Sequence, residues 1–138
     1  MKSILLALVL GSANAFACSC MEMDNAKEWF KDANTIFIGT ATRDSRSAGR
    51  LDGEPAVVTE FLVREGIKNV SRRDRVVVMS VRGDGANCGA NWRRGEGPVL
   101  VFSYLHRGRL ITDMCSVADP LTMSNRAFLT GLRRLARP

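Results

Sequence analysis

The sequence lacks any run of apolar residues long enough to cross a membrane. A membrane-spanning helix needs about 18 or more such residues, and the apolar run at residues 4–10 is much shorter. Internal repeats and low-complexity tracts are also absent. These absences argue against a membrane span and a repeat architecture, and they indicate one soluble domain, for which a monomer is expected.

Histidine is almost absent, because the chain contains only His106. A Ser-His-Asp triad or a histidine-based zinc site would depend entirely on this residue, and its place before Arg107 and Gly108 is typical of a tight turn. No spacing between acidic residues singles out a catalytic pair of carboxylates. We therefore expect that the chain is not an enzyme and that it needs no cofactor.

Acidic residues are fewer than basic ones, at 14 against 20, which gives a formal net charge of +6. A positive balance can favour nucleic acid, acidic polysaccharide or an acidic lipid surface as a partner. The basic residues are scattered along the chain, however, and the densest group, at residues 126–137, is typical of one solvated helix face. No nucleic-acid partner is therefore expected.

The first residues have the form of a secretory signal peptide. Lys2 precedes the apolar run, and residues 15–17, Ala-Phe-Ala, form a small-x-small cleavage site. We expect residues 1–17 to be removed and residues 18–138 to form the mature domain. The protein is then expected to be secreted, into an extracellular or periplasmic space.

The position of the cleavage decides what stands at the new amino terminus. Cleavage after Ala17 makes Cys18 the first residue, with a free α-amine one residue away from Cys20. Cleavage after Ala15 would leave two residues in front of Cys18. Lipoprotein processing would instead acylate Cys18 and block its amine. These alternatives stay open.

All four cysteines lie after the expected cleavage site, at positions 18, 20, 88 and 115. Exported cysteines meet an oxidising compartment and pair, and four cysteines allow three connectivities. A bond between Cys18 and Cys20 would close a very small, strained ring, so we discount that connectivity. The two others both join the amino terminus to the distant half of the chain, and the residues alone do not choose between them.

The remaining pattern predicts a mainly β domain with a short amino-terminal helix and a carboxy-terminal helix. Strands are predicted at residues 34–43, 56–63, 75–81, 98–105 and 109–113. Helices are predicted at 24–31 and 124–135, and the polar, Gly-rich segment 44–55 predicts a loop. Five short strands with flanking helices indicate a small, partly closed β-barrel of the oligonucleotide/oligosaccharide-binding (OB) type.

Four short motifs stand out in the mature chain. The first is Cys-Ser-Cys at residues 18–20, and the second is Phe-Ile-Gly-Thr at 37–40. The third is Cys-Gly at 88–89, followed by a Gly-rich turn and the apolar segment 99–104, and the fourth is Cys115. Together they resemble the inhibitory domain of the tissue inhibitors of metalloproteinases, a netrin-like module, over nearly the whole mature chain.

The resemblance implies a disulfide pairing and a mode of action. The family's pairing, carried over, is Cys18–Cys88 and Cys20–Cys115. In the family, the α-amine and the carbonyl oxygen of the first residue chelate the catalytic zinc of a metalloendopeptidase, which is the partner implied here. Cys18 would supply both donor atoms, and Ser19 would enter the pocket beside the metal. The zinc belongs to the target, so the chain carries no metal of its own.

The family also uses the residues just before its Cys-Gly pair to brace the docked terminus, and the resemblance implies that role for Ala86 and Asn87. Cys20 and Met21 lie beside the terminus and are expected to add supporting contacts, with Met21 as an adaptable apolar side chain. The alternative reading is a secreted or lipid-anchored binding module of the OB type without protease inhibition. In that reading Cys18 and Cys20 serve only as cross-links in a small exported domain.

Overall fold

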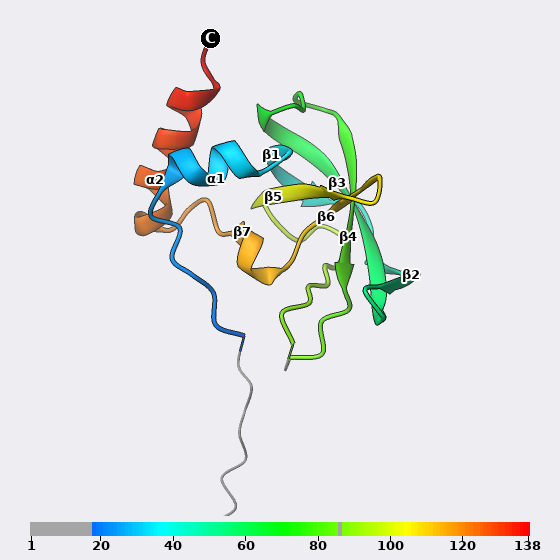
Figure 1. Ribbon diagram of the computed structural model, residues 1–138. Helices are drawn as coiled ribbons and strands as arrows, with labels where there is room; N and C mark the ends of the chain where they lie inside the picture. The colour runs from blue at the N-terminus through cyan, green and yellow to red at the C-terminus, as the bar shows by residue number, and fades with distance from the viewer. Residues whose placement is uncertain (1–17, 86) are drawn as a thin grey trace, which may run out of the picture.

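The computed structural model describes residues 18–85 and 87–138; the predicted signal peptide at 1–17 and the predicted contact residue Ala86 lie outside them. The elements, in chain order, are α1 (Ala26–Asp32), β1 (Thr35–Ala41), β2 (Arg46–Leu51), β3 (Glu54–Lys68), β4 (Arg75–Val81), β5 (Val99–His106), β6 (Arg109–Ile111), the 3-10 helix η1 (Met114–Ser116), β7 (Val117–Ala118) and α2 (Met123–Ala136). The expectation of a mainly β fold with one flanking helix at each end is confirmed (Figure 1).

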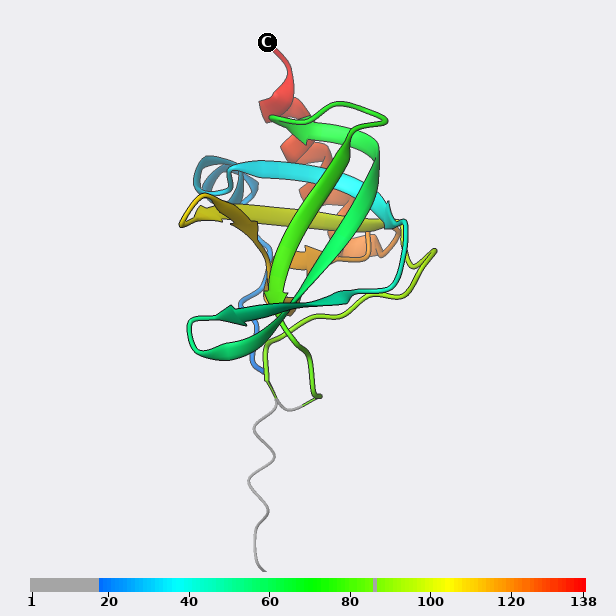
Figure 2. The same cartoon turned by 90° about the vertical axis from the view of Figure 1, so that its right-hand side faces the viewer.

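Five of the described strands pair into a closed ring. β1 lies antiparallel to both β3 and β5, β3 lies antiparallel to β4, and β5 lies antiparallel to β6. The ring closes where β4 and β6 run parallel, at the pair Met79 and Ile111. Beside this pair, the Thr112 backbone N–H donates to the Met79 carbonyl oxygen at 2.9 Å. Figure 2 shows β3 and β4 crossing in front of β1 and β5.

The described residues form seven strands, so the prediction of five was incomplete. β2 lies inside the segment 44–55, which the sequence predicts as a loop, and it pairs with the first part of β3. No β2 residue is buried, and the hairpin extends away from the ring (Figure 2). Because neither face of β2 packs on a core, the strand has no apolar alternation that would reveal it. β7 is two residues long and pairs with β5.

β1 is buried on both faces, which explains its apolar run. Ile36 and Ile38 belong to a cluster that includes the helices, whereas Phe37 belongs to a cluster on the opposite face, since side chains alternate along a strand. The helix-facing cluster comprises Ala33, Ile36, Ile38, Ile67, Leu100, Phe102, Phe128, Leu129 and Leu132. The ring-facing cluster comprises Phe37, Ala41, Phe61, Val63, Val76, Val78, Ala90, Trp92 and Val101.

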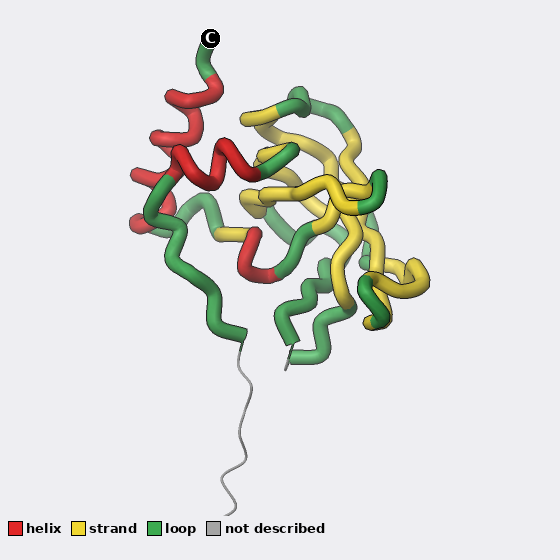
Figure 3. The backbone as a smooth tube through the Cα atoms, viewed as in Figure 1, coloured by secondary structure: helices red, strands yellow, loops and turns green. Residues whose placement is uncertain are grey.

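Both helices lie on the same side of the ring (Figure 3). α1 begins after Asn25, whose side-chain oxygen accepts a hydrogen bond from the Glu28 backbone N–H at 3.3 Å. α2 packs against α1 and places Phe128, Leu129 and Leu132 in the helix-facing cluster. Within residues 18–85 and 87–138, no helix is long and apolar enough to span a membrane.

Candidate functional site

The two disulfides join the amino-terminal segment to two distant parts of the chain. Cys18 is bonded to Cys88, with the Cα atoms 5.2 Å apart, and Cys20 is bonded to Cys115, with the Cα atoms 5.0 Å apart. All four cysteines lie in the described part of the chain, and none of them is free. Of the two connectivities that the residues leave open, the structure has the one that the resemblance implies.

The two bridges lie against each other. The sulfur atoms of Cys18 and Cys115, which belong to different bridges, are 3.5 Å apart. The sulfur atoms of Cys18, Cys20 and Cys115 all lie within 4.8 Å of one another. A metal ion would need them as thiolates, and each is instead held in a disulfide, so the three sulfurs act here as cross-links.

The anchored segment is exposed from Ser19 to Met21. Ser19 and Cys20 are exposed, and the Met21 side chain is 83% exposed. Met23 differs, because its half-buried side chain packs against the helix-facing cluster. The structure therefore leaves Ser19 and Met21, two of the predicted contact residues, accessible next to the bridges.

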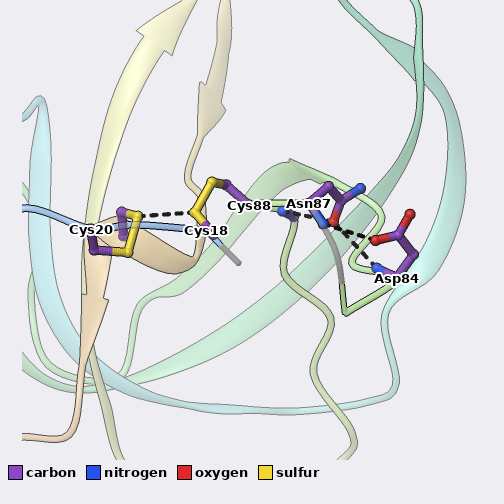
Figure 4. The surroundings of a disulfide bond; sticks show 7 residues. Cys18, Cys20, Asp84, Asn87 and Cys88 are labelled. Atoms are coloured by element: carbon purple, nitrogen blue, oxygen red, sulfur yellow. Dashed lines mark hydrogen bonds between the residues drawn. A yellow bond between two sulfur atoms is a disulfide. The ribbon is translucent and has the colours of Figure 1, made fainter. Parts of the chain in front are cut away.

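Asn87, another predicted contact residue, holds together the loop that carries Cys88. Its side-chain oxygen accepts from the backbone N–H groups of Asp84 at 3.3 Å and Gly89 at 3.1 Å, and its amide donates to the Arg82 carbonyl oxygen at 2.9 Å. The Asn87 backbone N–H donates to Asp84 Oδ1 at 2.9 Å. Figure 4 shows these residues in a row from Cys20 through Cys18 and Cys88 to Asn87 and Asp84. Asn87 thus positions Cys88 through backbone contacts.

A second asparagine, which the sequence did not single out, braces the same loop. Asn91 Oδ1 accepts from the Gly83 backbone N–H at 3.2 Å, and Asn91 Nδ2 donates to the Gly83 carbonyl oxygen at 2.8 Å. The loop also folds tightly on β4: a Cβ atom at Gly89 would lie 2.4 Å from the Val81 carbonyl oxygen. Glycine next to Cys88 is the one signal in the sequence that points to this close approach.

The loop is also tied to the segment of the second bridge. The Met114 backbone N–H donates to the Cys88 carbonyl oxygen at 3.1 Å. We call residues 18–23, 82–85, 87–91 and 113–116 together the terminal edge. Two disulfides and this backbone hydrogen bond hold its three segments side by side.

Two grooves border the terminal edge. The first, of about 720 Å³, lies between residues 20–24 and the start of α2, and Met21, Met114 and Phe128 are among its lining residues. The second, of about 510 Å³, lies on the other side, between Cys88 and the β2–β3 hairpin. Burial raises the pKa of Tyr104, which lines the second groove, although a hydrogen bond with Ser116 partly opposes this rise.

The single histidine lies away from the terminal edge. His106 Nε2 is 3.3 Å from Asp52 Oδ1, in a contact between the end of β5 and the β2–β3 turn.

Comparison of the chain with models of protein families and with curated protein sequences finds no match.

Proposed function

We propose that this protein is a secreted inhibitor of zinc metalloendopeptidases and that its fold is a netrin-like barrel of the OB type. In this proposal the five-stranded ring is the barrel, and signal-peptide cleavage makes Cys18 the first residue. One observation supports the proposal most: two disulfides fix residues 18–20 to Cys88 and Cys115, while Ser19 and Cys20 stay exposed.

The chemistry of the proposed inhibition belongs to the main chain of Cys18. A catalytic zinc ion keeps one coordination position open for water, and the free α-amine and the carbonyl oxygen of Cys18 would together displace that water. The Cys18 sulfur is not a donor, because it is bonded to Cys88. The exposed Ser19 would place its small side chain in the pocket beside the metal.

The anchoring would lower the entropic cost of docking. A free chain terminus loses conformational freedom when it binds, and a terminus that is already ordered loses less. Cys20 and its bridge to Cys115 order one end of the segment, and Asn87 orders the loop that holds Cys88. The exposed Met21 side chain would add an adaptable apolar contact with the target.

An added alanine in front of Cys18 tests the proposal. The exported, oxidised protein, with its start at Cys18 verified by intact mass, is titrated against a panel of zinc endopeptidases. The alanine-extended protein is titrated beside it, and a protein with one alanine added after Pro138 is the matched control. We expect inhibition by the unextended and control proteins and a loss of potency by orders of magnitude in the extended one.

The outcomes separate the proposal from its alternative. Equal inhibition by all three proteins would contradict chelation by the Cys18 amine. No inhibition by any of them would favour a binding module without protease inhibition, and an acyl group on Cys18 in the intact mass would assign that module to a lipid anchor.

The pH dependence of inhibition gives an independent test. An α-amine has a reference pKa of about 8 and must lose its proton to coordinate a metal. Inhibition should therefore weaken as the pH falls below about 7. Inhibition that does not change between about pH 6 and about pH 9 would count against amine coordination.

A further inference from the structure

The second groove beside the terminal edge combines an apolar floor with an acidic rim. Leu51, Val81, Tyr104 and Ile111 supply apolar surface. Among the described residues, the charged ones that line it are Glu54, Asp84 and Asp113, without any lysine or arginine. In a chain with 20 basic and 14 acidic residues, this groove reverses the sign of the overall charge. We call it the acidic groove.

Backbone hydrogen bonds hold the walls of the acidic groove in place. The Arg82 N–H donates to the Pro55 carbonyl oxygen at 2.8 Å and joins the β2–β3 hairpin to the Cys88 loop. The Met114 N–H donates to the Cys88 carbonyl oxygen at 3.1 Å and joins that loop to the segment after β6. Because all three walls are joined, the groove exists before any partner arrives, and little ordering is needed to fill it.

Two of the rim carboxylates are available to a partner. Among the described residues, no side chain forms an ion pair or a hydrogen bond with the carboxylate of Glu54 or Asp113. Asp84 differs, because its Oδ1 accepts from the Asn87 backbone N–H. The neighbouring Arg82 is not a lining residue, and its guanidinium donates to the Ser47 hydroxyl instead of pairing with a rim carboxylate.

We propose that the acidic groove binds a lysine or arginine side chain that the target presents next to its zinc cleft. The methylene stem of such a side chain would lie along the apolar floor, and its cationic head would reach the carboxylates at the rim. This inference rests on the proposed function for its partner, since Cys88 lines the groove and is bonded to Cys18. A cation bound there would lie beside the docked amino terminus.

The groove can be tested without any protease, which separates its failure from that of the proposed function. The probe is acetyl-leucyl-arginine amide, and its citrulline analogue has almost the same shape without the charge. Backbone amide chemical shifts of the exported, oxidised protein are followed during each titration. We expect saturable shifts at Leu51, Asn87 and Ile111 with millimolar affinity for the arginine probe, and binding of the citrulline probe that is at least about tenfold weaker.

Paired charge-removing variants assign the binding to the groove. Glu54→Gln with Asp113→Asn should weaken the arginine probe about tenfold and leave the citrulline probe unchanged. Glu22→Gln with Asp24→Asn removes two carboxylates that line the first groove instead, and this matched control should bind both probes as the parent does. The alanine-extended protein should also bind normally, because the groove does not use the Cys18 amine.

Three results would overturn the inference. They are equal binding of the two probes, equal loss in both double variants, and the absence of saturable shifts at millimolar probe. Each leaves the zinc-chelation proposal standing, since that proposal is tested by inhibition and by the added alanine. Loss of inhibition in the alanine-extended protein, with the arginine probe still bound, would support both.

Discussion

The helical side of the molecule and its terminal edge are held by different forces. On the helical side, Leu100 and Phe102 of β5 and Leu132 of α2 are completely buried in the helix-facing cluster. On the terminal edge, Met21 and Met114 are 83% and 44% exposed, and two disulfides take the place of packing. Apolar side chains stabilise a fold only when they are removed from water. Covalent bonds can instead order a segment that stays exposed, which is what a docking surface requires.

The largest effect should come from removing a bridge at the terminal edge. Cys20→Ser with Cys115→Ser opens a loop with a sequence separation of 95 residues. We expect the free energy of unfolding, measured with urea, to fall by about 4–5 kcal/mol, because the unfolded chain regains the freedom that the cross-link removes. Ser19→Ala, in the same exposed segment, is the control and should change it by less than about 0.5 kcal/mol.

If the free energy of unfolding fell by less than about 1 kcal/mol in the bridge variant, disulfides would not be the main force that holds the terminal edge. Such a result would mean that non-covalent contacts suffice to hold residues 18–23 against the rest of the domain. The Cys18–Cys88 bridge should still form in this variant, because Asn87 and Asn91 hold the Cys88 loop without help from the Cys20–Cys115 bridge.

A cavity on the helical side should have the next largest effect. Leu132 is 0% exposed, so Leu132→Ala removes buried apolar contacts and should lower the free energy of unfolding by about 3 kcal/mol. Leu135 lies one turn away and is 40% exposed, and Leu135→Ala should cost less than about 1 kcal/mol. Alanine is the better helix former at both positions, so a difference between the two variants reports packing.

The Leu132→Ala substitution should leave the terminal edge unchanged. Both bridges should still form in Leu132→Ala, and the proposed inhibition, measured well below the unfolding transition, should be unchanged. Loss of inhibition in a folded Leu132→Ala protein would show that the edge depends on the helical packing as well as on its disulfides.

The helical side is the part of the molecule that periodicity reveals. The spacing of Phe128, Leu129 and Leu132 predicts an amphipathic helix, and the structure buries all three. β1 is predicted from a different signal, because both of its faces are buried and residues 36–38 form a continuous apolar run of β-rich residues. Burial therefore leaves a readable pattern in the sequence, as a helical period in α2 and as an apolar run in β1.

The terminal edge and β2 leave no such period. β2 is held by backbone pairing with β3 and has no buried residue. The contacts of Asn87 and Asn91 are local bonds between side chains and backbone, which depend on the loop conformation and not on residue spacing. The choice between two disulfide connectivities came from a family resemblance, since cysteine positions alone allow both.

An ion pair on the surface of the helical side should contribute little. Arg133 donates to both oxygens of Glu65, each at 2.6 Å, and thereby joins α2 to β3. Both side chains are partly exposed, so Glu65→Gln should lower the free energy of unfolding by less than about 1 kcal/mol. A double-mutant cycle with Arg133→Gln isolates the pair. A coupling above about 2 kcal/mol would show that charge, and not only packing, holds this side together.

The smallest effect concerns Tyr104, which lies where the two regions meet. Its ring packs against the helix-facing cluster. Burial is the main cause that raises the pKa of Tyr104, and Asp113 and Asp32 raise it further, because an apolar and negative surrounding disfavours the phenolate. The folded state then holds the proton more tightly than the unfolded chain. The stability that Tyr104 contributes is complete below about pH 10 and is lost as the pH rises through the folded-state pKa.

Tyr104 is the only tyrosine in the chain, so the absorbance of tyrosinate reports its titration alone. The midpoint should lie above about 10 in the native protein and return to about 10 in concentrated urea. Tyr104→Phe should remove the part of the stability loss above about pH 10 that this residue causes. Equal midpoints in the two states would mean that water reaches the phenol, and that the helix-facing cluster does not extend to the terminal edge at this point.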